Sequence, residues 1–122
     1  MNIYDKLNDL TKAISESSEF ISYKNAAEAV NANEQYSQMV KEFITVQMQI
    51  STSRLFGQEP PSNVIEQFNT MYNVVTGIET VNNFLQCQMR FSKIMEDITK
   101  EVSKVATLDY DFLNIMPNMD GM

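Results

Sequence analysis

The chain has 122 residues, with nine basic and sixteen acidic side chains and a net charge of −7. A chain of this length forms one domain, and its acidic balance argues against direct binding to nucleic acid or to an anionic membrane surface. The apolar content of 43% is that of a globular protein. No apolar run is long enough to span a membrane, and the N-terminus lacks the pattern of a signal peptide. We therefore expect a cytoplasmic protein.

The first third of the chain predicts two short helices, because apolar residues recur three and four positions apart. The first helix, over residues 3–16, has the stripe Ile3, Leu7, Leu10 and Ile14. The second, over residues 19–31, has the stripe Phe20, Tyr23, Ala27 and Val30. The pair Ser17-Ser18 interrupts the pattern, and either serine can cap the second helix. One continuous helix through this pair is the alternative.

A longer helix is expected over residues 34–56, followed by a loop and a short helix over residues 63–76. Asn33 is a suitable N-cap for the long helix, and Gly57 can end it in a left-handed conformation. Pro60 and Pro61 prevent its continuation, and Ser62 is a candidate cap for the helix that follows. The stripe of the short helix is Val64, Phe68, Met71 and Val75.

The longest helix is predicted over residues 79–106. Its apolar seam steps by three and four and consists of Phe84, Phe91, Met95, Ile98 and Val102, with Gln88 as the one polar position. Neighbouring apolar residues widen this seam to roughly half of the helix circumference. An apolar arc of that width needs more than one neighbouring helix to cover it.

These patterns predict an all-α fold of about five helices, in which the two long helices pack nearly antiparallel and shorter helices flank them. Residues 1–106 form a single helical domain, and residues 107–122 form a C-terminal tail. We expect the wide arc of the last helix to be completed in a dimeric helical bundle. The predicted core and interface residues are Phe43, Val46, Ile50, Phe84, Phe91, Met95 and Ile98.

The tail alternates acidic and large apolar side chains. Leaving such apolar groups in water forgoes about 1.5–3 kcal/mol for each one that could be buried. The tail is therefore expected to dock, either on its own dimer or on another protein. The candidate partner segment consists of Tyr110, Phe112, Leu113 and Ile115.

The sequence carries no pattern of catalysis. It contains no histidine, which is the commonest general base and metal ligand. Its three glycines are too scattered for a phosphate-binding loop. Cys87, the single cysteine, is interpreted as a small buried residue, with one thiolate of an iron–sulphur site shared between chains as the alternative. We expect no catalytic, cofactor-binding or metal-binding residues, and not an enzyme.

Four stretches, taken in order, resemble segments of the YlbF/YmcA-like family, which includes YheA-like proteins. They are ESSEFISYKNA (residues 16–26), NANEQYSQMVKEF (31–43), FGQEPP (56–61) and FLQCQMRFSKIMEDI (84–98). The chain departs from the family pattern at Glu34, where proline is common. It departs again at Cys87-Gln88, where Ala-Glu is common. The resemblance covers nearly the whole chain, from residue 3 to about residue 112.

The resemblance implies a helical, dimer-forming regulator with no catalytic residues. Such proteins act in Gram-positive bacteria on competence, sporulation, biofilm formation and the specificity of a membrane-tethered ribonuclease. It also implies a homodimer or a complex with a sister family member and a YaaT-like protein, in which iron–sulphur binding occurs. Two alternatives to a regulatory adaptor are a helical chaperone-like protein and a cofactor-carrying subunit with its site between chains.

Overall fold

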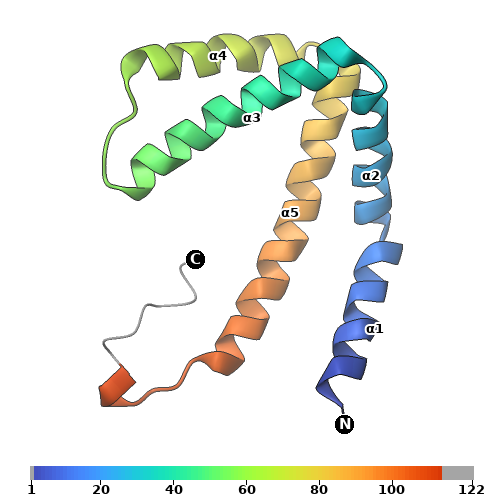
Figure 1. Ribbon diagram of the computed structural model, residues 1–122, viewed down its shortest axis with the longest axis vertical. Coiled ribbons are helices and arrows are strands. Elements are labelled where there is room, and N and C mark those ends of the chain that lie inside the picture. Colours follow the sequence, from blue (N-terminus) through green and yellow to red (C-terminus); the bar gives the residue numbers. More distant parts are fainter. Residues whose placement is uncertain (1, 114–122) are drawn as a thin grey trace.

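The computed structural model describes residues 2–113, and in that range the chain is helical without any strand (Figure 1). The elements are α1 (Ile3–Glu16), α2 (Ser18–Asn31), α3 (Glu34–Leu55), α4 (Ser62–Thr76), α5 (Glu79–Ala106) and the 3-10 turn η1 (Asp111–Leu113). Each α-helix begins and ends within one residue of its predicted position. The all-α prediction with five helices is therefore confirmed.

The break between α1 and α2 is made by one hydroxyl group. Ser17 has an extended backbone, and its Oγ accepts a hydrogen bond from the Phe20 amide at 3.2 Å. The same Oγ donates to the Ile14 carbonyl at 2.7 Å, so it satisfies backbone groups at the end of α1 and at the start of α2. The prediction of two helices rather than one is confirmed.

The two ends of α3 are formed by the residues that the sequence predicts. The side chain of Asn33 caps the helix by accepting from the Tyr36 amide at 3.1 Å. Gly57 adopts a φ of 73° after the last turn, the left-handed conformation that glycine tolerates best. The expectation for Ser62 is wrong: Pro61 holds the N-cap position of α4, Ser62 is its first residue, and no side chain caps this helix.

The helices form two antiparallel pairs that share one end and diverge from it (Figure 1). Helix α5 packs along α2, and α3 packs along α4. The expected packing of the two long helices against each other is therefore wrong within the chain. The reason is connectivity. The connection between α3 and α4 folds the chain back on itself, so α4 covers the apolar stripe of α3. Helix α2 covers the first half of the apolar stripe of α5.

The core lies where the two pairs meet. It contains buried side chains from α2, α3, α4 and α5, namely Ala26, Val30, Val40, Phe43, Val75, Val81, Phe84 and Cys87. Val75 and Val81 are the most completely buried, at 2% and 0% exposure. They lie on either side of the short turn at Gly77 and Ile78, in which Gly77 is exposed and Ile78 is half-buried against the core. Farther along the α3–α4 pair, Phe43 stacks on Phe68 with ring centroids 5.2 Å apart.

The predicted core residues divide into two groups in the structure. Phe43, Val46, Ile50 and Phe84 are buried, as expected. Phe91 and Ile98 are half-buried, and Met95 is exposed, because they lie beyond the part of α5 where the core lies. In the single chain these three residues therefore lie outside the core, and their assignment to an interface stays a prediction. No helix within residues 2–113 is both long and apolar enough to cross a membrane.

We expect Phe84→Ala to lower the free energy of unfolding by about 3–5 kcal/mol, since the ring is almost fully buried among four helices. Urea denaturation followed by circular dichroism measures this change. Phe56→Ala is a matched control, because that ring is 74% exposed, and its effect should stay within about 0.5 kcal/mol. A loss below about 1 kcal/mol for Phe84→Ala would place this ring outside the stabilising core.

Candidate protein-interaction surface

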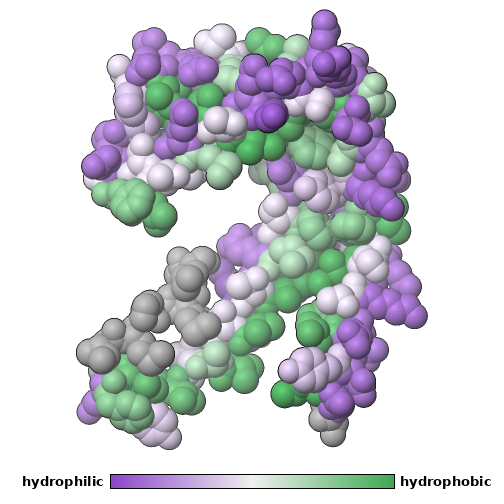
Figure 2. All heavy atoms as spheres, in the orientation of Figure 1, coloured by the Kyte–Doolittle hydropathy of each residue, from purple (hydrophilic) through white to green (hydrophobic). Residues whose placement is uncertain are grey.

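Large apolar side chains are exposed along α1 and along the C-terminal half of α5. No residue of α1 is buried, and Ile3 is 81% exposed. Near the end of α5, Val105 is 84% exposed. Figure 2 shows these hydrophobic side chains on the lower parts of both helices, where the two helices run apart. We call this surface the α1–α5 face; it consists of Ile3, Leu7, Leu10, Met95, Val102 and Val105.

The α1–α5 face continues the stripe that forms the core. At 100° per residue, Phe84, Phe91 and Val102 lie nearly on one line along α5. The N-terminal half of this line is covered by α2. Tyr23 stacks on Phe84 and on Phe91, with ring centroids 5.8 and 5.3 Å apart, and Phe20 contacts Phe91 at 5.4 Å. Beyond Phe91 the same stripe has no such cover.

The opposite side of α5 is charged and exposed to solvent. Lys93 pairs with Asp97 and Lys100 with Glu96, each at 3.0 Å, and all four side chains are more than half exposed. The hydrogen bond to Asp97 and the attraction of that carboxylate raise the pKa of Lys93 above its usual 10.5. These pairs follow the i, i+4 spacing of a solvated helix surface. The contrast between the two sides shows that α5 is amphipathic along its full length.

The surface area of the chain is large for its mass. It exposes 9601 Å², including residues 1 and 114–122, whereas a compact monomer of 14.0 kDa exposes about 6,700 Å². Helix pairs that diverge instead of closing on one core leave more surface exposed than a compact fold of the same mass (Figure 1). A difference of this size is comparable to the area that stable protein complexes bury.

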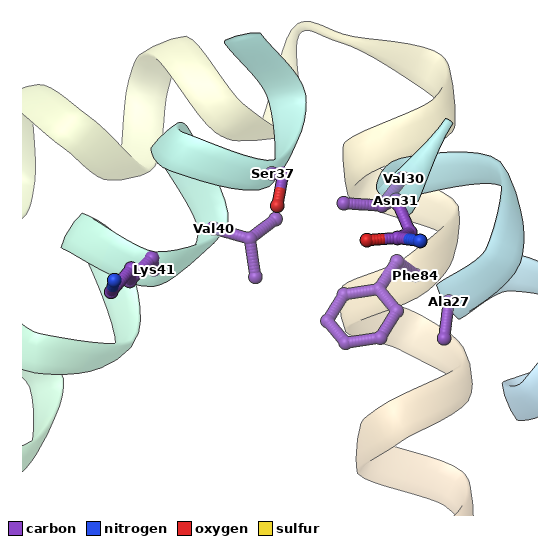
Figure 3. Close-up of a pocket in the computed structure, with 7 residues that line it drawn as sticks. All are labelled: Ala27, Val30, Asn31, Ser37, Val40, Lys41 and Phe84. Atoms are coloured by element: carbon purple, nitrogen blue, oxygen red, sulfur yellow. The ribbon is translucent and has the colours of Figure 1, made fainter. Parts of the chain in front are cut away.

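A hollow of about 390 Å³ lies where α2, α3 and α5 meet (Figure 3). Its wall is apolar, with the Phe84 ring facing Val40 across the opening, and its polar groups are the side chains of Ser37, Lys41 and Asn31. We call it the vertex hollow; Ala27 and Val30 complete its lining. It is open to solvent on the side where α3 and α5 diverge.

Cys87 lies in the core and is 3% exposed, so its interpretation as a small buried residue is confirmed. The Arg90 guanidinium donates a hydrogen bond to its sulphur at 3.3 Å. Among residues 2–113 no three histidine, cysteine, aspartate or glutamate side chains lie close enough to hold a metal ion.

The candidate partner segment is only partly described. Tyr110 and Phe112 are exposed and stack on each other with ring centroids 5.9 Å apart, while Leu113 is half-buried in the turn η1. Ile115 lies outside the described residues. Neither aromatic ring is covered by the helices, so the docking of this segment on another copy or on another protein stays a prediction.

Sequence reasoning missed two parts of this surface. It predicted short helices that flank the long ones, whereas α1 contacts α2 and leaves Ile3, Leu7 and Leu10 of its own stripe exposed. It also missed Ser37 and Lys41, which lie among polar residues and gain significance only from the position of α5.

The sequence matches known proteins over nearly its full length. It is 29% identical over 115 residues to a UPF0342 protein of Caldicellulosiruptor saccharolyticus, which covers 94% of this chain and 96% of that protein. It is 25% identical over 112 residues to a UPF0342 protein of Clostridium tetani, covering 92% and 97% of the two chains.

The fold matches a solved structure described as a protein of unknown function (DUF964) from Bacillus stearothermophilus. The TM-score is 0.70 at 18% identity, with 93% of this chain and 96% of the other covered. At that identity the likeness concerns the fold alone. Residues 3–105, from the start of α1 almost to the end of α5, match the family described as "Control of competence regulator ComK, YlbF/YmcA". The chain belongs to this YlbF/YmcA family.

Proposed function

We propose that this protein is a non-enzymatic regulator or adaptor that acts through protein–protein contacts as a cytoplasmic homodimer. The observation that carries the proposal is the α1–α5 face, an apolar surface that continues the core stripe and remains uncovered in the single chain. Each large side chain of this face contributes about 1.5–3 kcal/mol when it is fully buried. A partner surface of the same kind would therefore bind it strongly.

A second copy of the chain supplies such a surface. If the two α1–α5 faces meet, α1 and α5 of each copy form a four-helix arrangement around the exposed stripes. The three-and-four spacing of these stripes suits this type of helix packing. The charged pairs on the far side of α5 stay in water in this arrangement, so no charge is buried without a partner.

The family suggests which cellular process the protein regulates. Its description links the family to control of competence, whereas the UPF0342 relatives carry names without a function. We propose that the dimer, or a complex with a sister family member and a YaaT-like protein, influences competence, sporulation or biofilm formation. The absence of histidine from the sequence removes the commonest general base, which favours contact over catalysis.

A helical chaperone-like protein is the second candidate, because the α1–α5 face and its splayed helices could also hold an apolar segment of an unfolding protein. Aggregation of a model substrate distinguishes the two functions. A chaperone suppresses light scattering by heated citrate synthase at stoichiometric ratios, whereas an adaptor whose face is closed by a second copy leaves the aggregation unchanged.

We expect light scattering at micromolar concentration to give twice the 14.0 kDa chain mass. Val102→Glu should convert the dimer to a monomer of unchanged helix content, because Val102 is 61% exposed in the single chain and buried only by a partner. Gln86→Glu is the matched control: it adds the same charge on the opposite side of α5 and should leave the dimer intact. A monomeric wild-type chain would contradict the proposed homodimer.

In the organism of origin, deleting the gene should change transcript levels of competence genes. The wild-type chain and Gln86→Glu should restore these levels, whereas Val102→Glu should not, if regulation requires the α1–α5 face. RNA sequencing of the complemented strains measures the effect. Restoration by Val102→Glu would show that this face is dispensable, and unchanged transcripts after deletion would exclude a role in competence.

A further inference from the structure

Helix α1 is joined to the rest of the chain by one extended residue. Ser17, with a φ of −68° and a ψ of 147°, is the only residue between α1 and α2. Among the described helices α1 has extensive contact with α2 only, and none of its side chains is buried. Rotation about the backbone torsions of Ser17 can therefore tilt α1 as a rigid rod without breaking either helix.

An open gap separates α1 from the C-terminal half of α5, and apolar side chains lie on both sides of it (Figure 2). Their exposure rises along both helices with distance from Ser17. On α1 it rises from 36% at Leu10 to 49% at Leu7, and on α5 it rises from 61% at Val102 to 84% at Val105. The two apolar stripes therefore lose their cover in the same direction.

The aromatic contacts of α2 show which residues of α1 and α5 lie level with each other. Phe20 contacts Phe91 with ring centroids 5.4 Å apart, and α1 runs antiparallel to α5 (Figure 1). From Phe20 back to Ile14 the chain covers about 11 Å, in five helical steps and one extended step at Ser17. From Phe91 to Ile98 seven helical steps cover about 10.5 Å. Ile14 is therefore level with Ile98, and both side chains are half-buried.

From that level the two stripes continue with the same spacing. Along α1, Leu10 and Leu7 follow at steps of four and three, and along α5, Val102 and Val105 follow at the same steps. Because both helices have the same rise per residue, Leu10 is level with Val102, and Leu7 is level with Val105. The charged side chains on the opposite side of α1 stay in water when these pairs meet; they are Asp5, Asp9 and Lys12.

We propose that α1 is a strap, hinged at Ser17, that alternates between the open position of this structure and a closed position on α5, and that only the open position binds a second copy. This inference rests on the homodimer proposed above, because closing buries the same side chains that the second copy would cover. Closing takes place within one chain, so it does not depend on protein concentration. The apparent dissociation constant of the dimer equals the intrinsic one divided by the open fraction. The strap therefore sets the concentration above which the dimer forms.

Disulfide locking tests the strap. In a Cys87→Ala background, one variant carries Leu7→Cys with Val105→Cys, and a second variant carries Leu10→Cys with Val102→Cys. A disulfide requires Cβ atoms about 3.5–4.5 Å apart, so it forms within one chain only when the strap closes. Mild oxidation should give a single-chain band on a non-reducing gel, with thiols that resist alkylation after denaturation. The oxidised chain should be a monomer by light scattering at micromolar concentration, and reduction should restore the dimer.

The matched control pairs Asn8→Cys with Val105→Cys. Asn8 is exposed and lies about 100° around α1 from Leu7, so its disulfide should form more slowly. Each single-cysteine variant is measured alone to verify that its substitution leaves the dimer intact. Circular dichroism verifies that every variant is folded.

The outcomes separate the strap from the homodimer. A reduced dimer that forms an intramolecular disulfide faster than the control, and becomes a monomer when locked, supports the strap. A reduced dimer that forms no such disulfide in either variant, forms it no faster than the control, or stays dimeric when locked overturns the strap and leaves the homodimer standing. A monomeric wild-type chain overturns the homodimer and the regulation together.

Discussion

The burial of Val75 and Val81, on the two sides of the α4–α5 turn, is the constraint on which the rest of the structure depends. These side chains have the lowest exposure in the described core, and they join α4 to α5 where α2 and α3 also converge. Each helix pair is held by contacts along its own length, and within the described residues the core cluster that contains Val75 and Val81 joins the two pairs. Loss of packing here would leave two helical hairpins without a fixed angle between them.

Because the core is confined to this junction, the long helices extend beyond what it can cover. The apolar stripe of α3 is covered within the chain, because α4 runs back along it and Phe68 stacks on Phe43. The apolar stripe of α5 is covered only as far as Phe91, where the aromatic contacts with Phe20 and Tyr23 of α2 end. The remaining turns of α5 carry the same apolar stripe without a neighbour. An amphipathic helix that is much longer than its cover is therefore the source of the surface available for assembly.

Much of the fold could be predicted from the sequence, because local signals decided the helix boundaries. Ser17, Asn33 and Gly57 act through hydrogen bonds and backbone preferences within a few residues, and all three behave as predicted. Helix pairing was harder, since every helix shows the same three-and-four spacing and this spacing does not identify a partner. Similar length suggested α3 with α5, whereas connection geometry decided the pairs. The vertex hollow could not be predicted, because Ser37 and Lys41 look like ordinary surface residues until α5 is placed beside them.

The apolar side chains of the α1–α5 face can supply binding energy, but they do not determine which partner binds. Aliphatic side chains such as Leu7 and Val102 bind any stripe of similar spacing, so they cannot by themselves distinguish a second copy from a sister family member. Discrimination requires charge or shape at the edges of the contact. The Lys93–Asp97 and Lys100–Glu96 pairs satisfy one another on the far side of α5 and leave little net charge there to select a partner. At the C-terminal end of the stripe, Asp109 and Asp111 flank Tyr110. Beyond its other end, Lys41 belongs to the lining of the vertex hollow. Partner choice in this protein is therefore expected to depend on those ends, while the stripe between them supplies the binding energy.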